Sequence, residues 1–350
     1  MYINPLIKQI YRIKDHEDRR DYIRLDMNEN PVGLPQDIVD EILGKITPET
    51  IASYPCKERL RALIAEKEDV GVENVTLMNG SDEGIKLLYE VFSHAGANVV
   101  MVSPTFEMYR VYAAMYDVTV KAIDYGEDFC ITAQQVIEQI NENTDVVVLL
   151  NPNSPIGGVY TEDEFRQIIE VAAKHDALVC IDEAYYPFGV ETQVGLTKKY
   201  DNVMILRTFS KLYAMAGVRV GYSIASPDLI RYLENAQGSY NVNGIGILFA
   251  EEMLKRHEIT EYLVHAERAG RDYLVERLRE NDYEYYGETG NYILIKTKKD
   301  AKSVAQRLRE DKILIKTYGN ELLSSWVRIT TADRATMEKF WEAFQRAEKQ

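Results

Sequence analysis

The chain has 350 residues, of which 46% are hydrophobic and 28% are charged, a composition typical of a globular protein with a large core. Its 41 basic and 56 acidic residues give a net charge of −15, which argues against nucleic acid as a partner, because phosphate binding needs a basic surface. The longest purely apolar run, residues 146–150, is too short to cross a bilayer, and residues 1–20 hold no signal-like stretch. We therefore expect a cytoplasmic protein with no membrane partner.

The cysteines and histidines indicate neither disulfides nor a metal site. Cys56, Cys130 and Cys180 are far apart and form no CxxC pair, which is typical of a protein from a reducing compartment. The five histidines include no HExxH motif and no helical pair at metal-ligand spacing. We expect no bound metal.

Residues 45–225 alternate between short apolar runs and helical patterns. The expected strands are residues 72–78, 98–102, 118–123, 145–150, 178–182 and 203–206. The expected helices between them are residues 81–93, 106–116, 132–141 and 161–174, and a capping box of Thr161 and Glu164 opens the last one. This alternation predicts an α/β domain with a mostly parallel sheet and helices on both faces.

The pattern changes from residue 226 onward. Helical periodicity continues over residues 229–236 and 250–281. Strand-like segments then follow at residues 291–296, 313–316 and 327–330, with helical segments at residues 301–309 and 334–348. The pattern of residues 250–350 therefore predicts a smaller α+β domain.

A lysine and a serine follow the apolar segment 202–206, in the run Arg207-Thr208-Phe209-Ser210-Lys211. Arg219 comes eight residues after Lys211 and is flanked by small residues. One lysine for a Schiff base, with a serine and an arginine to hold a phosphate, is what the chemistry of pyridoxal phosphate (PLP) requires.

Two further polar residues follow neighbouring strands of the predicted sheet. Asn153 lies in the loop after residues 145–150, and Asp182 ends the apolar run 177–181. The spacings from Asn153 to Asp182 and from Asp182 to Lys211 are both 29 residues, which fits one helix and one strand. Because ligands bind at the carboxyl ends of parallel strands, we expect the three side chains to share one site. A carboxylate there can keep the pyridine nitrogen of PLP protonated.

The turn Gly80-Ser81-Asp82 joins the strand 72–78 to the helix 81–93. Backbone N–H groups at a helix N terminus bind anions. This turn therefore predicts a phosphate site that it shares with Ser210 and Arg219.

In this chain order, the motifs resemble those of fold type I PLP-dependent aminotransferases (class I/II), and most closely those of the histidinol-phosphate aminotransferases. The resemblance implies a large PLP-binding domain at residues 45–249 and a small domain at residues 1–44 and 250–350. It also implies that Lys211 holds the cofactor as an aldimine and, once released, moves a proton between substrate and cofactor.

The resemblance assigns roles to further residues near the cofactor. Asn153 and Tyr185 are expected to hydrogen-bond the 3′ oxygen of PLP, which lowers the pKa of the imine. Tyr109, in preference to Phe106, is expected to stack on the pyridine ring. Tyr54 matches a tyrosine that reaches the cofactor phosphate of the neighbouring subunit, which predicts a homodimer with shared active sites.

Substrate recognition is expected to involve four residues. Arg328 matches the arginine that binds the anionic group of the substrate in this family. Tyr11, which lies 17 residues before Asn28, matches a tyrosine that contacts phosphate, and we expect Asn28 to lie at the substrate as well. A second arginine of the family is Lys316 here, which keeps the charge but lacks the bidentate fork.

Three functions remain open. The first is transamination between an amino donor, histidinol phosphate or a related compound, and a 2-oxo acid acceptor, 2-oxoglutarate. The second is transamination of another amino acid, an aromatic one included, or decarboxylation of a phosphorylated amino acid such as threonine phosphate. The third is the effector domain of a bacterial regulator, but we expect no such role, because the residues before the Leu25–Pro31 motif are too few for a helix-turn-helix domain.

Overall fold

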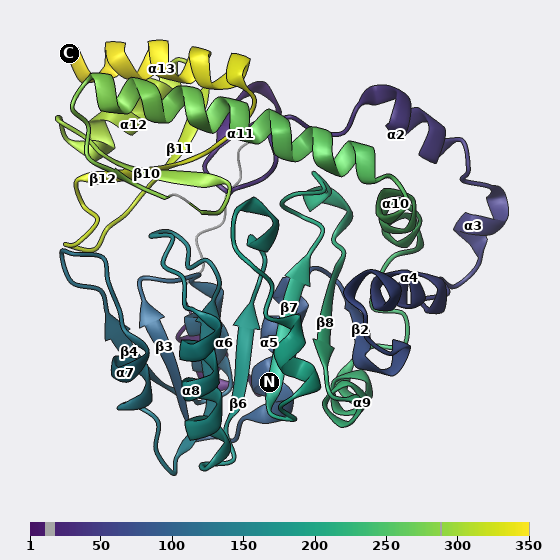
Figure 1. The fold of residues 1–350 in the computed structure, drawn as a ribbon. Coiled ribbons are helices and arrows are strands. Elements are labelled where there is room, and N and C mark those ends of the chain that lie inside the picture. The colour runs from purple at the N-terminus through teal and green to yellow at the C-terminus, as the bar shows by residue number, and fades with distance from the viewer. Residues whose placement is uncertain (11–17, 288, 350) are drawn as a thin grey trace.

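The computed structural model describes residues 1–10, 18–287 and 289–349. Its larger part is built on a seven-stranded sheet (Figure 1) with the strand order β2-β8-β7-β6-β5-β3-β4. The strands are β2 (Val75–Met78), β3 (Asn98–Ser103), β4 (Thr119–Asp124), β5 (Thr144–Leu150), β6 (Leu178–Asp182), β7 (Val203–Thr208) and β8 (Gly221–Ala225). Strand β8 is antiparallel to both of its neighbours, and the other pairs are parallel. The expected mostly parallel sheet is confirmed.

Helices cover both faces of this sheet. One face packs against α5 (Ser81–Phe92), α6 (Met108–Met115) and α9 (Pro227–Ala236). The other packs against α4 (Glu58–Glu68), α7 (Ala133–Ile137), α8 (Glu162–Ala173) and α10 (Gly244–Leu254). Because both faces are buried, the central strands are apolar on both sides, as parallel strands with helices on each face require.

A second sheet of five strands forms the smaller part, at the top of Figure 1. Its order is β1-β11-β12-β10-β9, and its strands are β1 (Ile23–Leu25), β9 (Tyr285–Tyr286), β10 (Tyr292–Lys296), β11 (Ile313–Thr317) and β12 (Trp326–Thr330). One face packs against α11 (His257–Glu280), α12 (Ala301–Glu310) and α13 (Arg334–Lys349). The other face turns toward the large sheet, where Leu294 and Trp326 belong to one buried cluster with Val102 and Ile156.

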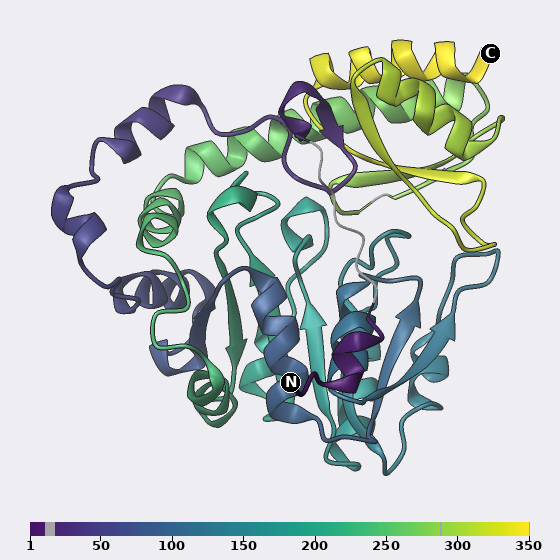
Figure 2. The same cartoon turned by 180° about the vertical axis from the view of Figure 1, so that it is seen from behind.

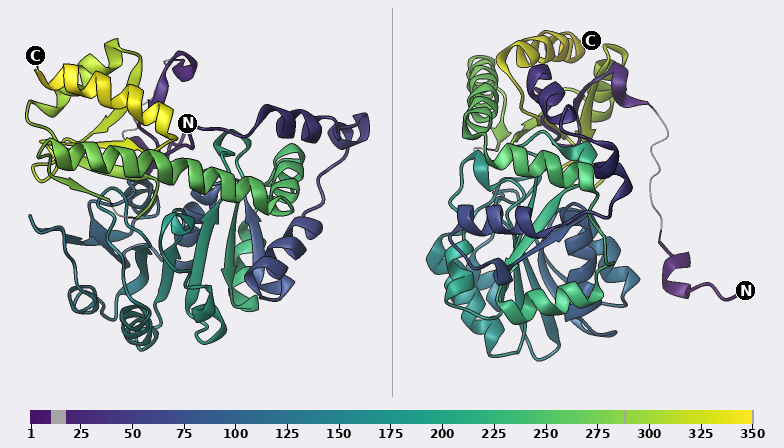
Figure 3. Two further views of the ribbon diagram at one scale, coloured as in Figure 1. Left: turned by 45° about the horizontal axis from the view of Figure 1, so that its top comes forward. Right: turned by 90° about the vertical axis from the view of Figure 1, so that its right-hand side faces the viewer.

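Two segments of the described chain connect the two parts. Helix α11 passes from one to the other (Figure 3), with Leu263 in the core of the large sheet and Leu274 in the core of the small one. Helices α2 (Gln36–Leu43) and α3 (Pro48–Ala52) follow β1 along the edge of the molecule, and Ile42 packs in the core of the large sheet. Helix α1 (Pro5–Lys8) lies beside α6 (Figure 2). The domain boundaries, before residue 45 and after residue 249, remain predictions.

The structure differs from the sequence prediction at several points, and the helix expected over 132–141 covers only Ala133–Ile137. Residues 72–74 of the expected first strand form a 3₁₀ turn, in which the Asn74 side chain accepts a hydrogen bond from the backbone of Gly71. The helical run expected over 250–281 is two helices, because the backbone of Arg256, between α10 and α11, leaves the helical region. Strand β8 was not predicted. In the part of the chain that the structure describes, no helix has the length and apolar character needed to cross a membrane.

Candidate active site

Three adjacent strands bring Asn153, Asp182 and Lys211 to one edge of the large sheet. Strand β6 lies between β5 and β7, and Asp182 is in register with Leu150 of β5 and Leu206 of β7. Asn153 lies three residues after the end of β5, and Lys211 lies three residues after the end of β7. This is the shared edge that the spacing of 29 residues predicts.

Asp182 is buried with only 4% of its surface exposed. Its Oδ2 accepts a hydrogen bond from the Tyr109 hydroxyl at 2.8 Å, and its Oδ1 accepts one from the backbone N–H of Ala184 at 3.0 Å. Burial raises the pKa of this carboxyl to about 6, although both hydrogen bonds act in the opposite direction. A buried carboxylate of this kind is suited to a cationic N–H partner.

The position of Tyr109 does not agree with the expected stacking on the cofactor ring. Its ring is fully buried in the core between α5, α6 and the sheet, and its hydroxyl is used by Asp182. Helix α6 begins at Met108, so Tyr109 lies in its first turn and faces the core. Phe106, which precedes the helix, is 43% exposed.

Lys211 and Tyr185 lie close together at the edge of the large sheet that Asp182 marks. The Lys211 Nζ is 5.6 Å from the centre of the Tyr185 ring and donates a hydrogen bond to the Met27 carbonyl at 2.9 Å. The Tyr185 hydroxyl accepts a hydrogen bond from Nδ2 of Asn28 at 3.1 Å. Residues 27 and 28 therefore lie against the proposed catalytic groups.

Gly80, Ser210 and Arg219 meet at the N terminus of α5. Gly80 has a φ of 73°, and a Cβ at this position would collide with the Arg219 guanidinium. Arg219 Nη1 donates to Ser210 Oγ at 3.4 Å, and Thr208 Oγ1 donates to the same atom at 2.9 Å. Ser81 and Asp82 form the first turn of α5, where Asp82 Oδ2 accepts a hydrogen bond from Tyr112 at 3.1 Å. Free helix N–H groups beside an arginine and a serine form an anion-binding cradle.

Asn153 is held by neighbours that the sequence did not point to. Its Nδ2 donates to the Pro104 carbonyl at 3.0 Å, and its Oδ1 accepts from Thr105 at 2.7 Å. Its backbone carbonyl accepts from the Tyr292 hydroxyl of β10 at 2.8 Å. Thr105 immediately precedes Phe106 in the chain, but no local pattern marks Tyr292, which is 139 residues from Asn153.

Arg328 and Lys316 lie opposite each other on β12 and β11. Arg328 Nη1 donates to Ser154 Oγ at 3.2 Å, and Nη2 donates to the carbonyl of Asp26. Its Nε is buried and has no hydrogen-bond partner among the described residues. Lys316 is exposed.

The remaining predicted residues are Tyr54, Asn28 and Tyr11. Tyr54 is 77% exposed and stacks on Tyr240, with 4.1 Å between the ring centres. Asn28 is fully buried and has no surface left to contact a substrate. Tyr11 lies outside the described residues.

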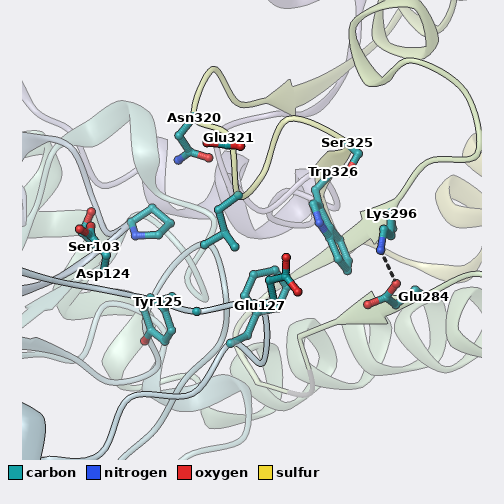
Figure 4. Close-up of a pocket in the computed structure, with 14 residues that line it drawn as sticks. Ser103, Asp124, Tyr125, Glu127, Glu284, Lys296, Asn320, Glu321, Ser325 and Trp326 are labelled. Carbon is teal, nitrogen blue, oxygen red and sulfur yellow. Dashed lines mark hydrogen bonds and ion pairs between the residues drawn. The ribbon is translucent and has the colours of Figure 1, made fainter.

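A cavity of about 810 Å³ lies next to the residues around Asn153, but none of the predicted cofactor residues lines it. Figure 4 shows acidic side chains around it and Lys296 paired with Glu284 at 2.8 Å. Ser103 and Pro104 border the cavity, and the Pro104 carbonyl is the partner of Asn153.

The model of the class I and II aminotransferase family matches residues 20–344. The chain belongs to this family. It is 33% identical to histidinol-phosphate aminotransferase 1 of Carboxydothermus hydrogenoformans over 311 residues, 88% of each chain.

Two solved structures show the same fold. The histidinol-phosphate aminotransferase of Sinorhizobium meliloti in complex with pyridoxal-5′-phosphate has a TM-score of 0.88 at 20% identity, covering 99% of this chain and 97% of that one. L-Threonine-O-3-phosphate decarboxylase of Porphyromonas gingivalis has a TM-score of 0.79 at 22% identity, covering 94% of this chain and 100% of that one.

This aminotransferase is a PLP-dependent enzyme of fold type I. Its described residues fit the cofactor, because the cradle at Gly80 and Arg219 suits the phosphate and the buried carboxylate of Asp182 suits a protonated ring nitrogen. When bound, PLP withdraws electrons from the carbon that carries the amino group of the substrate.

Proposed function

We propose that this aminotransferase transfers the amino group of histidinol phosphate to 2-oxoglutarate. The observation that carries the proposal is the pairing of Lys316 with Arg328. The two residues are direct partners in the antiparallel pair of β11 and β12, so their side chains leave the same face of the sheet. That face turns toward the large sheet, as the bond from Arg328 to Ser154 shows.

Two like charges in direct cross-strand positions repel each other. Among the described residues, neither Lys316 nor Arg328 forms an ion pair with an acidic side chain. A phosphate between the two cations would remove this repulsion and would accept charge-assisted hydrogen bonds from both. A phosphorylated amino compound is therefore the substrate class that the pair favours.

The relatives support the same substrate class. The protein of Carboxydothermus hydrogenoformans is named for histidinol phosphate, and the decarboxylase of Porphyromonas gingivalis for a phosphorylated threonine. Histidinol phosphate is our choice, because the relative with the higher sequence identity carries that name. An unphosphorylated aromatic amino acid would bring only its singly charged carboxylate to Lys316 and Arg328, whereas a phosphate carries a charge of about −1.5 to −2 at pH 7.

The residues at the sheet edge have the following proposed roles. Asp182 holds the ring nitrogen of the cofactor in its protonated form. Asn153 and Tyr185 donate hydrogen bonds to the 3′ oxygen, and Phe106 covers the ring in place of Tyr109. Lys211 binds the cofactor through Nζ and later moves the proton from the α-carbon of the substrate as a general base.

The proposed assembly is a homodimer in the cytoplasm. The ring of Tyr54 is 77% exposed and lies on a surface with the exposed Tyr240, which suits a contact with a second subunit. The three cysteines form no disulfide, and two of them are exposed, which fits a reducing compartment.

The substrate is tested by comparing histidinol phosphate with histidinol in the Lys316→Met variant. Loss of one charge-assisted contact should lower kcat/KM for histidinol phosphate by about 10- to 100-fold. The value for histidinol should stay within about twofold, because no phosphate contact is lost. Lys296→Met is the matched control, since Lys296 lies on the same face of the sheet but is paired with Glu284. An equal loss for both substrates would contradict phosphate binding by Lys316.

A further inference from the structure

Asn28 is fully buried, and each of its four polar groups has a hydrogen-bond partner. The backbone N–H donates to Thr330 Oγ1 at 3.0 Å, and the backbone carbonyl accepts from Asn291 Nδ2 at 3.1 Å. The side-chain Oδ1 accepts from Thr330 Oγ1 at 3.3 Å, and Nδ2 donates to the Tyr185 hydroxyl at 3.1 Å. Asn28 therefore uses all of its polar groups in hydrogen bonds within the protein.

Thr330 determines which end of the Asn28 amide faces Tyr185. A threonine hydroxyl has one proton to donate, and here it goes to Oδ1, while the oxygen accepts the backbone N–H of Asn28. With Oδ1 bonded to Thr330, the NH₂ end of the amide points toward Tyr185. The tyrosine oxygen is an acceptor in that bond, so its own proton is free for another partner.

The backbone of Asn28 holds this arrangement in place. Its φ is 54°, in the left-handed region that asparagine tolerates better than most residues. Its partners come from both parts of the molecule, since Thr330 ends β12 of the small sheet and Tyr185 follows β6 of the large one. Strand β12 also carries Arg328, two residues before Thr330 and on the same face.

We propose that Asn28, oriented by Thr330, is a positioning residue that keeps the Tyr185 proton available for the 3′ oxygen of the cofactor. The inference rests on the proposed role of Tyr185. A hydrogen bond donated to that oxygen stabilises its anionic form. The bound cofactor then loses its imine proton at a lower pH than it would without the bond.

The test is the pH midpoint at which the visible absorbance of the cofactor changes in the PLP-loaded enzyme. In Asn28→Asp the new carboxylate accepts a hydrogen bond from the Tyr185 hydroxyl, so the direction of the hydrogen bond is reversed. The midpoint should rise by about 1–2 pH units, the value of one hydrogen bond to a charged group. Tyr185→Phe should produce a rise of similar size.

The double variant separates the hydrogen bond from the charge. In the Tyr185→Phe background, Asn28→Asp should add little, because no tyrosine proton remains to be redirected. An equal shift with and without the tyrosine hydroxyl would overturn the role of Asn28. If Tyr185→Phe itself leaves the midpoint unchanged, the proposed role of Tyr185 fails, and the role of Asn28 fails with it.

Thr330→Val provides a second variant that keeps the shape of the side chain. It removes the hydroxyl that orients the amide, so Asn28 can turn its oxygen toward Tyr185. We expect a smaller rise of the midpoint in the same direction, which should vanish in the Tyr185→Phe background. A rise that persists there would mean that Thr330 acts by another route, and would overturn its part in the inference.

Discussion

The hydroxyl of Tyr109 donates a hydrogen bond to Oδ2 of Asp182 at 2.8 Å, deep in the large part of the molecule. This bond lowers the pKa of a carboxyl whose burial raises it to about 6. The two effects together set the pH range in which Asp182 is ionised and able to hold a protonated ring nitrogen. Tyr109 thus supports the cofactor site from behind Asp182.

Removal of this hydroxyl should shift the acid limb of the activity profile. In Tyr109→Phe the pKa of Asp182 rises, so the acid limb of kcat/KM should move to higher pH by about one unit. Tyr116→Phe is the control, because Tyr116 also donates to a carboxylate, that of Glu90, but at the surface. An acid limb that stays in place in Tyr109→Phe would show that Asp182 does not set it.

The raised pKa of Asp182 also predicts how the cofactor-free protein responds to pH. A carboxyl whose pKa is higher in the folded state contributes stability that is present below about 4 and is lost as the pH rises through about 6. Asp182→Asn removes this loss, so the free energy of unfolding of the cofactor-free variant should exceed that of the wild type at pH 7 by at most about 3 kcal/mol. The difference should shrink below pH 4. Urea unfolding at pH 7 and below pH 4 measures this difference. If Asp182→Asn is no more stable than the wild type at pH 7, Asp182 does not carry a buried charge in the cofactor-free protein.

Loss of the phosphate cradle is predicted for Gly80→Ala. The Cβ would collide with the Arg219 guanidinium, so PLP affinity should fall at least about tenfold, as judged by titration of the cofactor-free protein. Gly96→Ala is a matched control, because Gly96 has a φ of 88° but no atom within 4 Å of the added Cβ. Gly96→Ala should lose stability and keep its affinity. Equal affinities in both variants would contradict the predicted displacement of Arg219 from the phosphate site.

Sharing of active sites between subunits is tested by mixing two inactive variants. Lys211→Ala lacks the cofactor-binding lysine, and Tyr54→Ala lacks the tyrosine that is proposed to reach the partner subunit. A mixed dimer holds one complete site, so refolding the two together should restore up to about a quarter of wild-type activity if subunits pair at random. Absence of any recovery in dimers shown to be mixed would contradict the shared site.

The alternating pattern was enough to predict the large sheet and the residues at its edge. Parallel strands with helices between them place Asn153, Asp182 and Lys211 at one edge whatever the details of the packing. Strand β8 was missed because Gly221 and Ser223 interrupt its sequence, so that it forms neither a continuous apolar run nor an alternating pattern. The environment of Asn28 could not be predicted at all, since Thr330 lies 302 residues away and only the folded chain brings them together.

The most direct test of the central claim is a single-turnover reaction of the PLP-loaded enzyme with histidinol phosphate and no 2-oxo acid. We predict that the cofactor absorbance changes fully, with one oxo product released per active site, and that 2-oxoglutarate then restores the original spectrum. Parallel reactions with threonine phosphate and aromatic amino acids should be much slower, and threonine phosphate should release no carbon dioxide. A spectrum that histidinol phosphate leaves unchanged, while one of the other amines converts it, would contradict the proposed substrate.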